Sequence, residues 1–576
     1  MADGGVQQIV FTLTARCRDC YRCLRACPVK AIRMKNGQAY VDQARCIACG
    51  TCIRECPQQA KSFRQDVEIV QGFIDSGRFM VASIAPSFAA VFAGWQRKRL
   101  PSALRLLGFH YVGQTSQGAY QISAATAQLM NEDTARTYIA TACPALVNYV
   151  EKYEHDSVDN LIPLVSPMAA HARMLKKRFG DESAVVFIGP CVAKKSEILR
   201  PGVAGIVDCV LTFKELEAWL EQRGINLSMC EESDFDEKPV LDAQLYPLPG
   251  GSIKTADLHD DGLDRRIVRA DGVANVKEVI GSLASDPKYT LIEPLFCSQG
   301  CINGPGINRE KNIFERRRDI VEYNDEIRED RVTPTGEDRT LFRASFNEEV
   351  DLLPPVSEEE ILAVLESTGK ADPQQQLNCG ACGYESCRDK AIAVVQGMAE
   401  REMCIPFMRR LAERRTDRII DTSPNGIVIL DENLSILSMN PTFKHFFTCS
   451  DAVLGRHISY LMDPAPFEKL IAGMTEMIDT TATHRAYNLH CRQLMYMLKE
   501  ERQVVGIFMN ITTQQEQERR LKELKSQTVE QANELLEHQV KMAINIAQFL
   551  GESTAKGEAL VRRLMALSES DEKGLD

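Results

Sequence analysis

The chain has 576 residues, the length of about three to five domains, with a formal net charge of −12, 44% hydrophobic residues and 26% charged residues. These proportions are typical of a globular protein, and the negative charge argues against general nucleic-acid binding, which needs a basic face. The N-terminal residues show no basic stretch followed by an apolar one, and no apolar run approaches the ~20 residues that cross a bilayer. We therefore expect a cytoplasmic protein with neither a membrane nor a nucleic acid as partner.

Twenty cysteines stand out in this composition. In a large chain without an export signal they predict metal or cluster ligation rather than disulfides. Eight of them form two runs of identical spacing, Cys17-x2-Cys20-x2-Cys23-x3-Cys27-Pro28 and Cys46-x2-Cys49-x2-Cys52-x3-Cys56-Pro57. This spacing is that of two-cluster bacterial ferredoxins. We expect residues 1–65 to form a two-cluster ferredoxin-type domain that carries electrons.

In such ferredoxins the fourth cysteine of each run ligates the other cluster. Two [4Fe–4S] clusters are therefore expected, cluster one on Cys17, Cys20, Cys23 and Cys56, and cluster two on Cys46, Cys49, Cys52 and Cys27. A pair of zinc knuckles is the alternative, but zinc sites do not call for eight cysteines in a tandem repeat.

Residues 78–370 alternate strand-like apolar runs with helix-like runs, such as 79–85, 184–188 and 213–222. This alternation predicts an α/β domain with parallel strands, within a chain that combines α/β and α+β domains. In such folds the loops beyond the strand ends build the site. Cys191 follows the run 184–188 and is expected in such a loop.

Three cysteine segments of this domain resemble the cluster-binding motifs of the [FeFe]-hydrogenase large subunit. They occur in that family's order and are Thr141-Ala142-Cys143-Pro144, Gly189-Pro190-Cys191 through Lys194, and Cys297-Ser298-Gln299-Gly300-Cys301. The stretches Ser83–Ser87 and Leu106–Phe109 add to the resemblance. It implies an H-cluster, which is a [4Fe–4S] cubane joined to a di-iron unit that carries CO and cyanide.

The same resemblance assigns roles to individual residues. It implies that the cubane is held by Cys143, Cys191, Cys297 and Cys301, and that Cys301 bridges to the di-iron unit. Lys194 matches the lysine that donates to one cyanide, a role suited to an ammonium facing an anion. Ser87 matches a small residue near the other cyanide. A plain cubane without the di-iron unit, as in a degenerate homologue, is the alternative.

The chain also departs from the family's pattern. Fast members have a proton-passing cysteine where this chain has Ala142. They also have carboxylates in the helix that supplies the next steps of the proton relay, whereas the matching residues 121–126 contain no acid. General acid–base help is typically worth about 10²–10⁴-fold, so slow turnover is expected. Gly189 stands where the family has methionine, and Pro305 interrupts a glycine run, and we expect both to alter the surroundings of the cavity.

A further cysteine set occupies residues 371–410 and resembles a small iron–sulfur domain of other redox proteins. It consists of Cys379, Cys382, Cys387 and Cys404, with two glycines that permit sharp turns between the first three. We expect one more [4Fe–4S] cluster there, with zinc as the alternative. The remaining cysteines are expected to be ordinary thiols, although Cys491 could ligate something together with His484 and His490; they are Cys209, Cys230, Cys449 and Cys491.

Residues 416–513 resemble a PAS domain. Two strand-like runs at 427–430 and 434–439 flank a polar turn, short helices follow from Asn440, and an apolar strand covers 504–512. An unrelated small α+β domain is the alternative, and no flavin or haem motif is evident.

Residues 514–576 are highly charged and helix-like, with apolar residues at heptad spacing. Such rows predict a coiled coil and favour a homodimer, whereas one amphipathic helix packed on its own chain is the alternative.

Three functions fit these features. The first is a slow, sensory [FeFe]-hydrogenase, which interconverts H2 with two protons and two electrons, exchanges electrons with a carrier such as ferredoxin, and signals to a partner protein through the PAS domain and helix. The second is an ordinary ferredoxin-linked hydrogenase, and the third is an iron–sulfur electron-transfer or scaffold protein without the di-iron unit. We favour the first, because the missing relay, the extra cubane and the dimer-type helix suit a ligand-dependent population shift rather than flux.

Overall fold

The computed structural model describes residues 8–258, 266–283, 289–334, 336–349, 353–498, 500–511 and Met542, without the side chains of 413–417. The chain divides into two compact units, residues 1–401 and 402–576. Apart from Met542, the predicted coiled coil at 514–576 lies outside the described residues. Within the described ranges, no helix has both the length and the apolar character of a membrane span.

The first unit begins with a small domain built around the two cysteine runs. Helices α1 and α2 each start inside a run and pack on one another, and two antiparallel strand pairs, β1 with β4 and β2 with β3, cover them. The bounds are β1 Val10–Thr12, α1 Arg22–Ala26, β2 Ile32–Lys35, β3 Gln38–Val41, α2 Thr51–Glu55 and β4 Lys61–Phe63.

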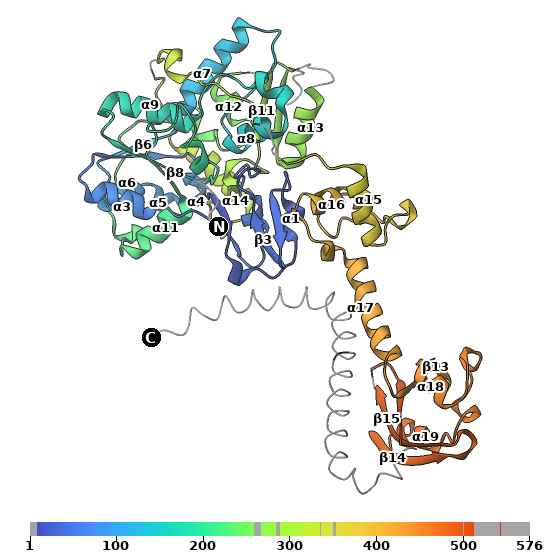
Figure 1. Ribbon diagram of the computed structural model, residues 1–576. Helices are drawn as coiled ribbons and strands as arrows, with labels where there is room; N and C mark the ends of the chain where they lie inside the picture. The colour runs from blue at the N-terminus through green and yellow to red at the C-terminus, as the bar shows by residue number, and fades with distance from the viewer. Residues whose placement is uncertain are drawn as a thin grey trace. The chain divides into compact units, whose positions relative to one another are not determined.

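A four-stranded parallel sheet in the order β6-β5-β8-β9 forms the core of the next domain. Helix α9 packs against β5 and β8, and α11 packs against β8 and β9 on the other side (Figure 1). The predicted α/β architecture with parallel strands is confirmed. The bounds are α3 Val67–Asp75, β5 Met80–Ile84, α4 Phe88–Val91, α5 Gly94–Arg97, α6 Leu100–Leu107, β6 Tyr111–Gln114, α7 Ser116–Glu132, α9 Pro167–Phe179, β8 Ala184–Gly189, α10 Lys194–Glu197, β9 Cys209–Thr212 and α11 Phe213–Gln222.

A second parallel sheet, in the order β10-β11-β7, stands beside the first, so the domain has two sheets. Helix α8 starts directly after Cys143, with proline at its first position, where the missing N–H costs nothing. The bounds are β7 Tyr138–Ile139, α8 Pro144–Tyr153, α12 Gly251–Thr255, β10 Ile267–Asp271, α13 Val273–Leu283, β11 Leu291–Leu295 and α14 Ile313–Glu326.

The first unit ends in a small helical segment that carries three of the four later cysteines. Helix α15, Glu358–Ser367, packs on α16, Cys387–Val395, through Ile361, Val364, Leu365 and Ala391. Figure 1 shows α16 beside α1 of the first domain.

The second unit holds a five-stranded antiparallel sheet in the order β13-β12-β16-β15-β14. Four buried phenylalanines, Phe443, Phe447, Phe467 and Phe508, fill its core. The strands predicted near 427–439 and 504–512 are present, whereas β14 and β15 were not predicted. The bounds are α17 Ile405–Asp421, β12 Gly426–Leu430, β13 Ile436–Met439, α18 Pro441–Phe446, α19 Ala465–Ile471, β14 Met477–His484, β15 Leu489–Leu498 and β16 Gln503–Asn510.

The possible ligand set around Cys491 does not gather in this unit. Cys491 is fully buried in the core, where burial raises the pKa of its thiol to about 11. His484 bonds Gln493 and packs its ring against Phe447, and His490 bonds Thr483. These contacts give each histidine a structural role.

Candidate functional site

Three loops that follow parallel strands converge in the first unit. Cys143 follows β7, Cys191 follows β8, and the Cys297–Cys301 loop follows β11. The carboxyl ends of parallel strands lie at one edge of a sheet, which is where such folds place their sites. The four thiols lie within electrostatic reach of one another, and Lys194 lies within reach of three of them, Cys143, Cys191 and Cys301.

Burial dominates the chemistry of these four thiols. It raises the pKa of Cys191 to about 12 and of Cys297 to about 11, and it also raises the pKa of Cys143 and Cys301. Neighbouring thiolates add to the shift at Cys191 and Cys301, since like charges oppose ionisation. These partly buried thiols would bind as thiolates to the iron of a cubane, whose positive charge offsets the cost of ionising them. The donor set therefore fits an iron–sulfur cluster.

A cavity of about 80 Å³ opens beside Cys191 and Cys301. This is room for more than one small group. Its wall is mainly apolar, from residues such as Ala85, Met168, Phe187 and Leu295, and the polar groups include Lys194, Ser87 and Thr115. An apolar wall with a few donors suits a small inorganic unit with neutral CO and anionic cyanide ligands, so the residues fit the di-iron unit as well.

Ser87 lies on this wall at the start of α4. Ser87 is 1% exposed, and its hydroxyl makes no capping hydrogen bond to α4. A buried hydroxyl beside a cavity favours a ligand as its partner, because buried polar groups are nearly always hydrogen-bonded.

Lys194 is a cation held by three oxygens. Its Nζ donates to Glu197 Oε2 at 2.6 Å, to Ser166 Oγ at 2.8 Å and to the carbonyl oxygen of Ala142 at 3.3 Å. An ammonium has three N–H donors, so all of them are engaged. The longest of these bonds, to Ala142, is the one that an anionic group in the cavity would replace most easily.

A much larger cavity, of about 610 Å³, lies behind this lysine, and Glu197 and Ser166 line it. The carboxylate that holds Lys194 can therefore meet water.

Ala142 and Tyr246 line both the cavity at the cysteines and a second, smaller one of about 10 Å³. Hydroxyls line the smaller cavity, from Ser123, Tyr246 and Ser252. Ser123 Oγ donates to the carbonyl oxygen of Ser252 at 3.2 Å and also bonds the hydroxyl of Tyr246.

An acid lies behind these hydroxyls, although none is present in residues 121–126 around Ser123. Glu293 of β11 is buried and accepts hydrogen bonds from the backbone N–H and hydroxyl of Ser252 and from the N–H of Gly250. Burial raises the pKa of this carboxyl, and the hydrogen bonds offset only part of the shift. Sequence reasoning missed this group, and the one available signal was its position four residues before Cys297.

Two departures from the family motifs have a structural counterpart. A Cβ added to Gly189 would lie 2.6 Å from the ring of Phe187, and that ring lines the cavity. Pro305 is not on the cavity wall, contrary to our expectation. It packs instead on Gly50 of the ferredoxin-type domain, where an added Cβ would lie 2.5 Å from Pro305 Cγ and φ is +72°. Both features demand glycine at position 50.

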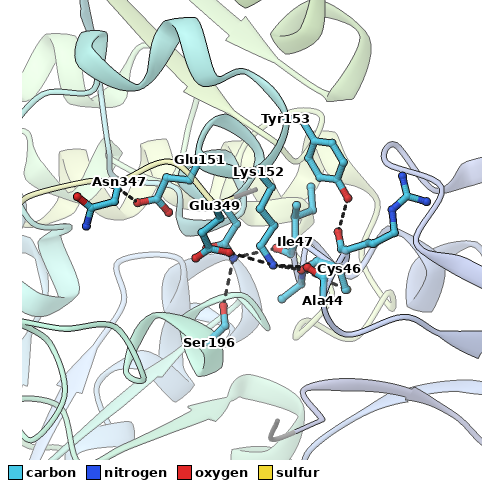
Figure 2. Close-up of polar contacts among 12 residues, drawn as sticks. Ala44, Cys46, Ile47, Glu151, Lys152, Tyr153, Ser196, Asn347 and Glu349 are labelled. Carbon is cyan, nitrogen blue, oxygen red and sulfur yellow. Dashed lines mark hydrogen bonds and ion pairs between the residues drawn. The ribbon is translucent and has the colours of Figure 1, made fainter. Parts of the chain in front are cut away.

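The first domain is docked beside this site through the loop of residues 44–47, which contains Cys46. Figure 2 shows Lys152 and Tyr153 at the end of α8 pointing toward this loop. Lys152 Nζ donates to the carbonyl oxygen of Ala44 at 2.7 Å, and Tyr153 donates to that of Arg45 at 2.6 Å. Helix α8 thus joins the loop of Cys143 to a loop of the predicted cluster two.

Arg54 makes the most direct link between the two domains. Its guanidinium donates to the carbonyl oxygen of Asn303 at 3.0 Å and hydrogen-bonds Cys297, where it lowers the thiol pKa against the larger effect of burial. Cys49 also lies within electrostatic reach of Cys297.

A buried ionic cluster fixes the same two domains farther from the cysteines. Lys195 is fully buried, and its Nζ lies 2.8 Å from Asp66 Oδ2 and 3.0 Å from Glu215 Oε1. Asp66 caps α3 just after the first domain, and Glu215 lies in α11. Adjacent lysines therefore face different surroundings, Lys194 the cavity and Lys195 this cluster.

The cysteines of the first domain lie in two groups. The pKa of Cys23 is raised by burial and by its neighbours Cys17, Cys20 and Cys56. The pKa of Cys52 is raised by burial and by a different set, Cys27, Cys46 and Cys49. These groups match the exchange of the fourth cysteine between the runs. Lys61 lies near both Cys23 and Cys52 and favours their thiolates. Among the described residues, no group of three His, Cys, Asp or Glu side chains is spaced for a single metal ion.

The later cysteines are divided between the two units of the chain. Cys379, Cys382 and Cys387 belong to the first unit, where Lys370 Nζ donates to Cys387 Sγ at 3.0 Å. Cys404 belongs to the second unit and caps α17.

Comparison with known families agrees with these elements. Residues 78–305 match the model of the iron only hydrogenase large subunit, C-terminal domain, and residues 9–57 that of a 4Fe-4S dicluster domain. Residues 375–406 match an Fe-S cluster family, and residues 414–479 match a PAS domain. The class is thus a multidomain iron–sulfur protein with a PAS domain. Its central domain is of the [FeFe]-hydrogenase large-subunit family.

Relatives of two kinds resemble this chain. The NADP-reducing hydrogenase subunit HndD of Solidesulfovibrio fructosivorans is 25% identical over 42% of this chain and 52% of its own length. The cytosolic Fe-S cluster assembly factor narfl of Xenopus tropicalis is 25% identical over 42% and 64%. The cytosolic Fe-S cluster assembly factor NAR1 of Vanderwaltozyma polyspora is 41% identical over 16% and 17%. The chain therefore spans less than two thirds of each of these relatives.

Solved structures resemble separate parts of the chain. The [FeFe]-hydrogenase HydA1 of Chlamydomonas reinhardtii aligns over 50% of this chain and 99% of its own, with 18% identity and a TM-score of 0.39. The PAS domain of an HTR-like protein from Haloarcula marismortui aligns over 18% and 99%, with 18% identity and a TM-score of 0.16.

Proposed function

We propose that this protein is a low-turnover [FeFe]-hydrogenase that serves as a sensor of H2 or of redox state. The observation that carries the proposal is the cavity beside Cys191 and Cys301, with Lys194 and Ser87 as donors and Ala142 in place of a proton-passing side chain. When bound, the H-cluster supplies the reversible conversion of H2 into two protons and two electrons.

The chain's own residues have three tasks in this proposal. Cys143, Cys191, Cys297 and Cys301 hold the cluster, and Lys194 and Ser87 orient its anionic ligands by hydrogen bonds. The apolar wall excludes water, which strengthens these bonds. The methyl group of Ala142 can neither donate nor accept a proton, and burial raises the pKa of Tyr246, which also lines the cavity and so holds its proton firmly. Proton delivery is therefore the step that limits turnover.

Infrared spectroscopy of anaerobically matured protein tests this proposal. CO and cyanide bands are expected, together with H2 turnover far below that of a fast hydrogenase. Bands with fast turnover would favour an ordinary ferredoxin-linked hydrogenase. No bands after maturation would rule out both functions and leave a plain cubane at this site.

A plain cubane is the second candidate function, that of an iron–sulfur electron-transfer or scaffold protein. The similarity to two proteins named as cytosolic Fe-S cluster assembly factors favours it. Iron analysis of protein loaded with cubanes and then matured discriminates the two. An H-cluster adds two iron atoms per chain, and a plain cubane adds none.

The other clusters and the PAS domain complete the proposed sensor, which we place in the cytoplasm. We assign cubanes to the two groups of the ferredoxin-type domain and to Cys379, Cys382, Cys387 and Cys404. A carrier such as ferredoxin would exchange electrons with the first domain, and a signalling protein would bind the PAS domain or the helix after it. Sedimentation of the full chain and of a chain ending at Ile511 tests the homodimer. An undiminished dimer in the shorter chain would exclude the helix as the dimer contact.

A further inference from the structure

The loop between Cys382 and Cys387 is packed tightly on the ferredoxin-type domain. A Cβ added to Gly383 would lie 3.0 Å from Leu24 Cγ and 3.3 Å from the backbone N of Arg25, and φ at Gly383 is +94°. Arg25 Nη1 donates to the carbonyl oxygen of Ala381 at 3.1 Å, and its Nη2 donates to that of Cys20 at the same distance. The loop thus touches the helix that lies between Cys20 and Cys27.

Tyr384 fills this contact. It is 6% exposed, and its hydroxyl has no hydrogen-bond partner among the described residues. Cys382 and Cys27 both lie within its electrostatic reach. Lys30, which donates to the carbonyl oxygen of Leu24 at 3.4 Å, also lies within reach of both thiols. A buried tyrosine hydroxyl thus lies within electrostatic reach of a thiol of the third cysteine set and of a thiol assigned to cluster two.

A second contact holds the same two parts together. Glu400 accepts from the backbone N–H groups of Asn36 at 2.6 Å and Gly37 at 3.3 Å, in the turn between β2 and β3. The N–H of Met34 donates to the carbonyl oxygen of Met398 at 3.0 Å. Contacts before and after α16 restrict movement of the cysteine loop relative to Cys27.

The opposite side of cluster two faces the central site. Its expected ligand Cys49 lies within reach of Cys297, and Gly50 packs on Pro305. Of the predicted clusters in the first domain, cluster two is thus the one in contact with both the central cysteines and the third set.

We propose that cluster two is a branch point, from which electrons pass to the cubane of the third cysteine set as well as to cluster one. With both cubanes bound by their cysteines, the branch would be a one-electron transfer that oxidises cluster two and reduces the third cubane. Electron tunnelling falls steeply with distance and is better through packed atoms than through solvent, so the contact at Tyr384 favours it. Oxidation of H2 as the electron source rests on the proposed function, but the contact itself does not.

Electron paramagnetic resonance of protein produced without maturation, which would carry cubanes alone, tests this branch. After full reduction, the signal of cluster two should show splitting or fast relaxation from a nearby spin. The part of these effects that comes from the third cubane should be lost in Cys387→Ser, which removes a ligand of that cubane and should lower the iron content by that cubane alone. Coupling to cluster one and to the central cubane should remain. A cluster-two signal that is identical with and without the third cubane would overturn the inference.

Two glycine substitutions test whether the coupling depends on the contact between this loop and Leu24. Gly383→Ala should weaken the coupling, because its Cβ meets Leu24. Gly397→Ala is the matched control, since Gly397 also has a positive φ, +69°, but nothing lies within 4 Å of its added Cβ. Equal coupling in both variants, with the third cubane retained, would place the contact elsewhere and contradict the role of this loop.

Failure of this inference can be told apart from failure of the proposed function. Coupling without CO and cyanide bands would leave the branch in place and remove the H-cluster. CO and cyanide bands without coupling between cluster two and the third cubane would contradict the branch and leave the proposed H-cluster in place.

Discussion

The two sides of the central cavity differ in their chemistry. On the Lys194 side, a cation, a carboxylate and a hydroxyl are linked by hydrogen bonds, and the large cavity behind them admits water. On the Ala142 side, a methyl group faces the cavity, and the nearest acid, Glu293, lies behind a layer of hydroxyls. The Lys194 side therefore carries charged donors and acceptors, whereas the Ala142 side offers a methyl group and the hydroxyl of Tyr246. Four substitutions test this difference.

Lys195→Met should lower the free energy of unfolding more than the other three substitutions. Its effect is the value with which Lys194→Met is compared. It leaves Asp66 and Glu215 buried without their shared cation, and breaking a buried pair costs about 3–5 kcal/mol. Arg64 still pairs with Asp66 at 2.7 Å, so Glu215 alone loses its cation, and we expect the middle of this range. Chemical denaturation of the full chain would measure it, and an unchanged midpoint would contradict the structural role of this cluster.

Lys194→Met should destabilise less, by about 3 kcal/mol, because the unpaired Glu197 borders the large cavity and can be hydrated. It should also prevent retention of the di-iron unit, read as loss of the infrared bands, whereas Lys194→Arg keeps the charge. A loss of stability equal to that of Lys195→Met would show that water does not reach Glu197.

Ala142→Cys should restore a proton-passing side chain on the other wall. General acid–base help is worth about 10²–10⁴-fold, and we expect the lower end, about 2.7 kcal/mol, because hydroxyls rather than carboxylates follow. Ala142→Ser is the control, since a hydroxyl ionises far less readily than a thiol. If turnover and the solvent isotope effect stay the same in the cysteine variant, proton delivery at this wall does not limit the rate.

Glu293→Gln should have the smallest effect and should change mainly the dependence on pH. Burial raises the pKa of Glu293 above its ordinary value of 4.5, so the folded state holds this proton at a pH where the unfolded chain has lost it. This part of the stability is present below pH 4.5 and is lost as the pH rises through the folded pKa. The variant should lack that loss. Thermal unfolding across this pH range would measure it, and parallel curves would show that Glu293 is ionised in the folded protein.

Local patterns in the sequence were sufficient for part of the fold. The run 213–222 became α11 because Thr212 and Glu215 form a capping box that fixes its start. The strands β14 and β15 were missed, since β14 is mostly exposed and consists largely of threonine and other polar residues. No local pattern could have divided the central strands between two sheets, which depends on pairing between distant segments.

The same limit applies to the candidate site. Cysteine spacing identified the thiols, because each loop that wraps a cluster is short. Glu293 escaped notice, since the residues that hold it, Gly250 and Ser252, lie more than forty positions away. Pro305 was expected at the cavity but packs on Gly50 across a domain boundary, and no pattern within one segment can predict a contact of that kind.

The ring of Phe187 has a consequence for how this protein family can diverge. It lies 2.6 Å from the place of a Cβ at position 189, so a longer side chain there requires this ring to move or to be replaced by a smaller side chain. The two positions form an epistatic pair, and a stepwise route between this chain and a relative with methionine at 189 is easier if it first passes through a smaller residue at 187. We expect Gly189→Met to be tolerated in a Phe187→Ala background and rejected in the parent chain. The two substitutions should then be found together, not singly, in homologous sequences.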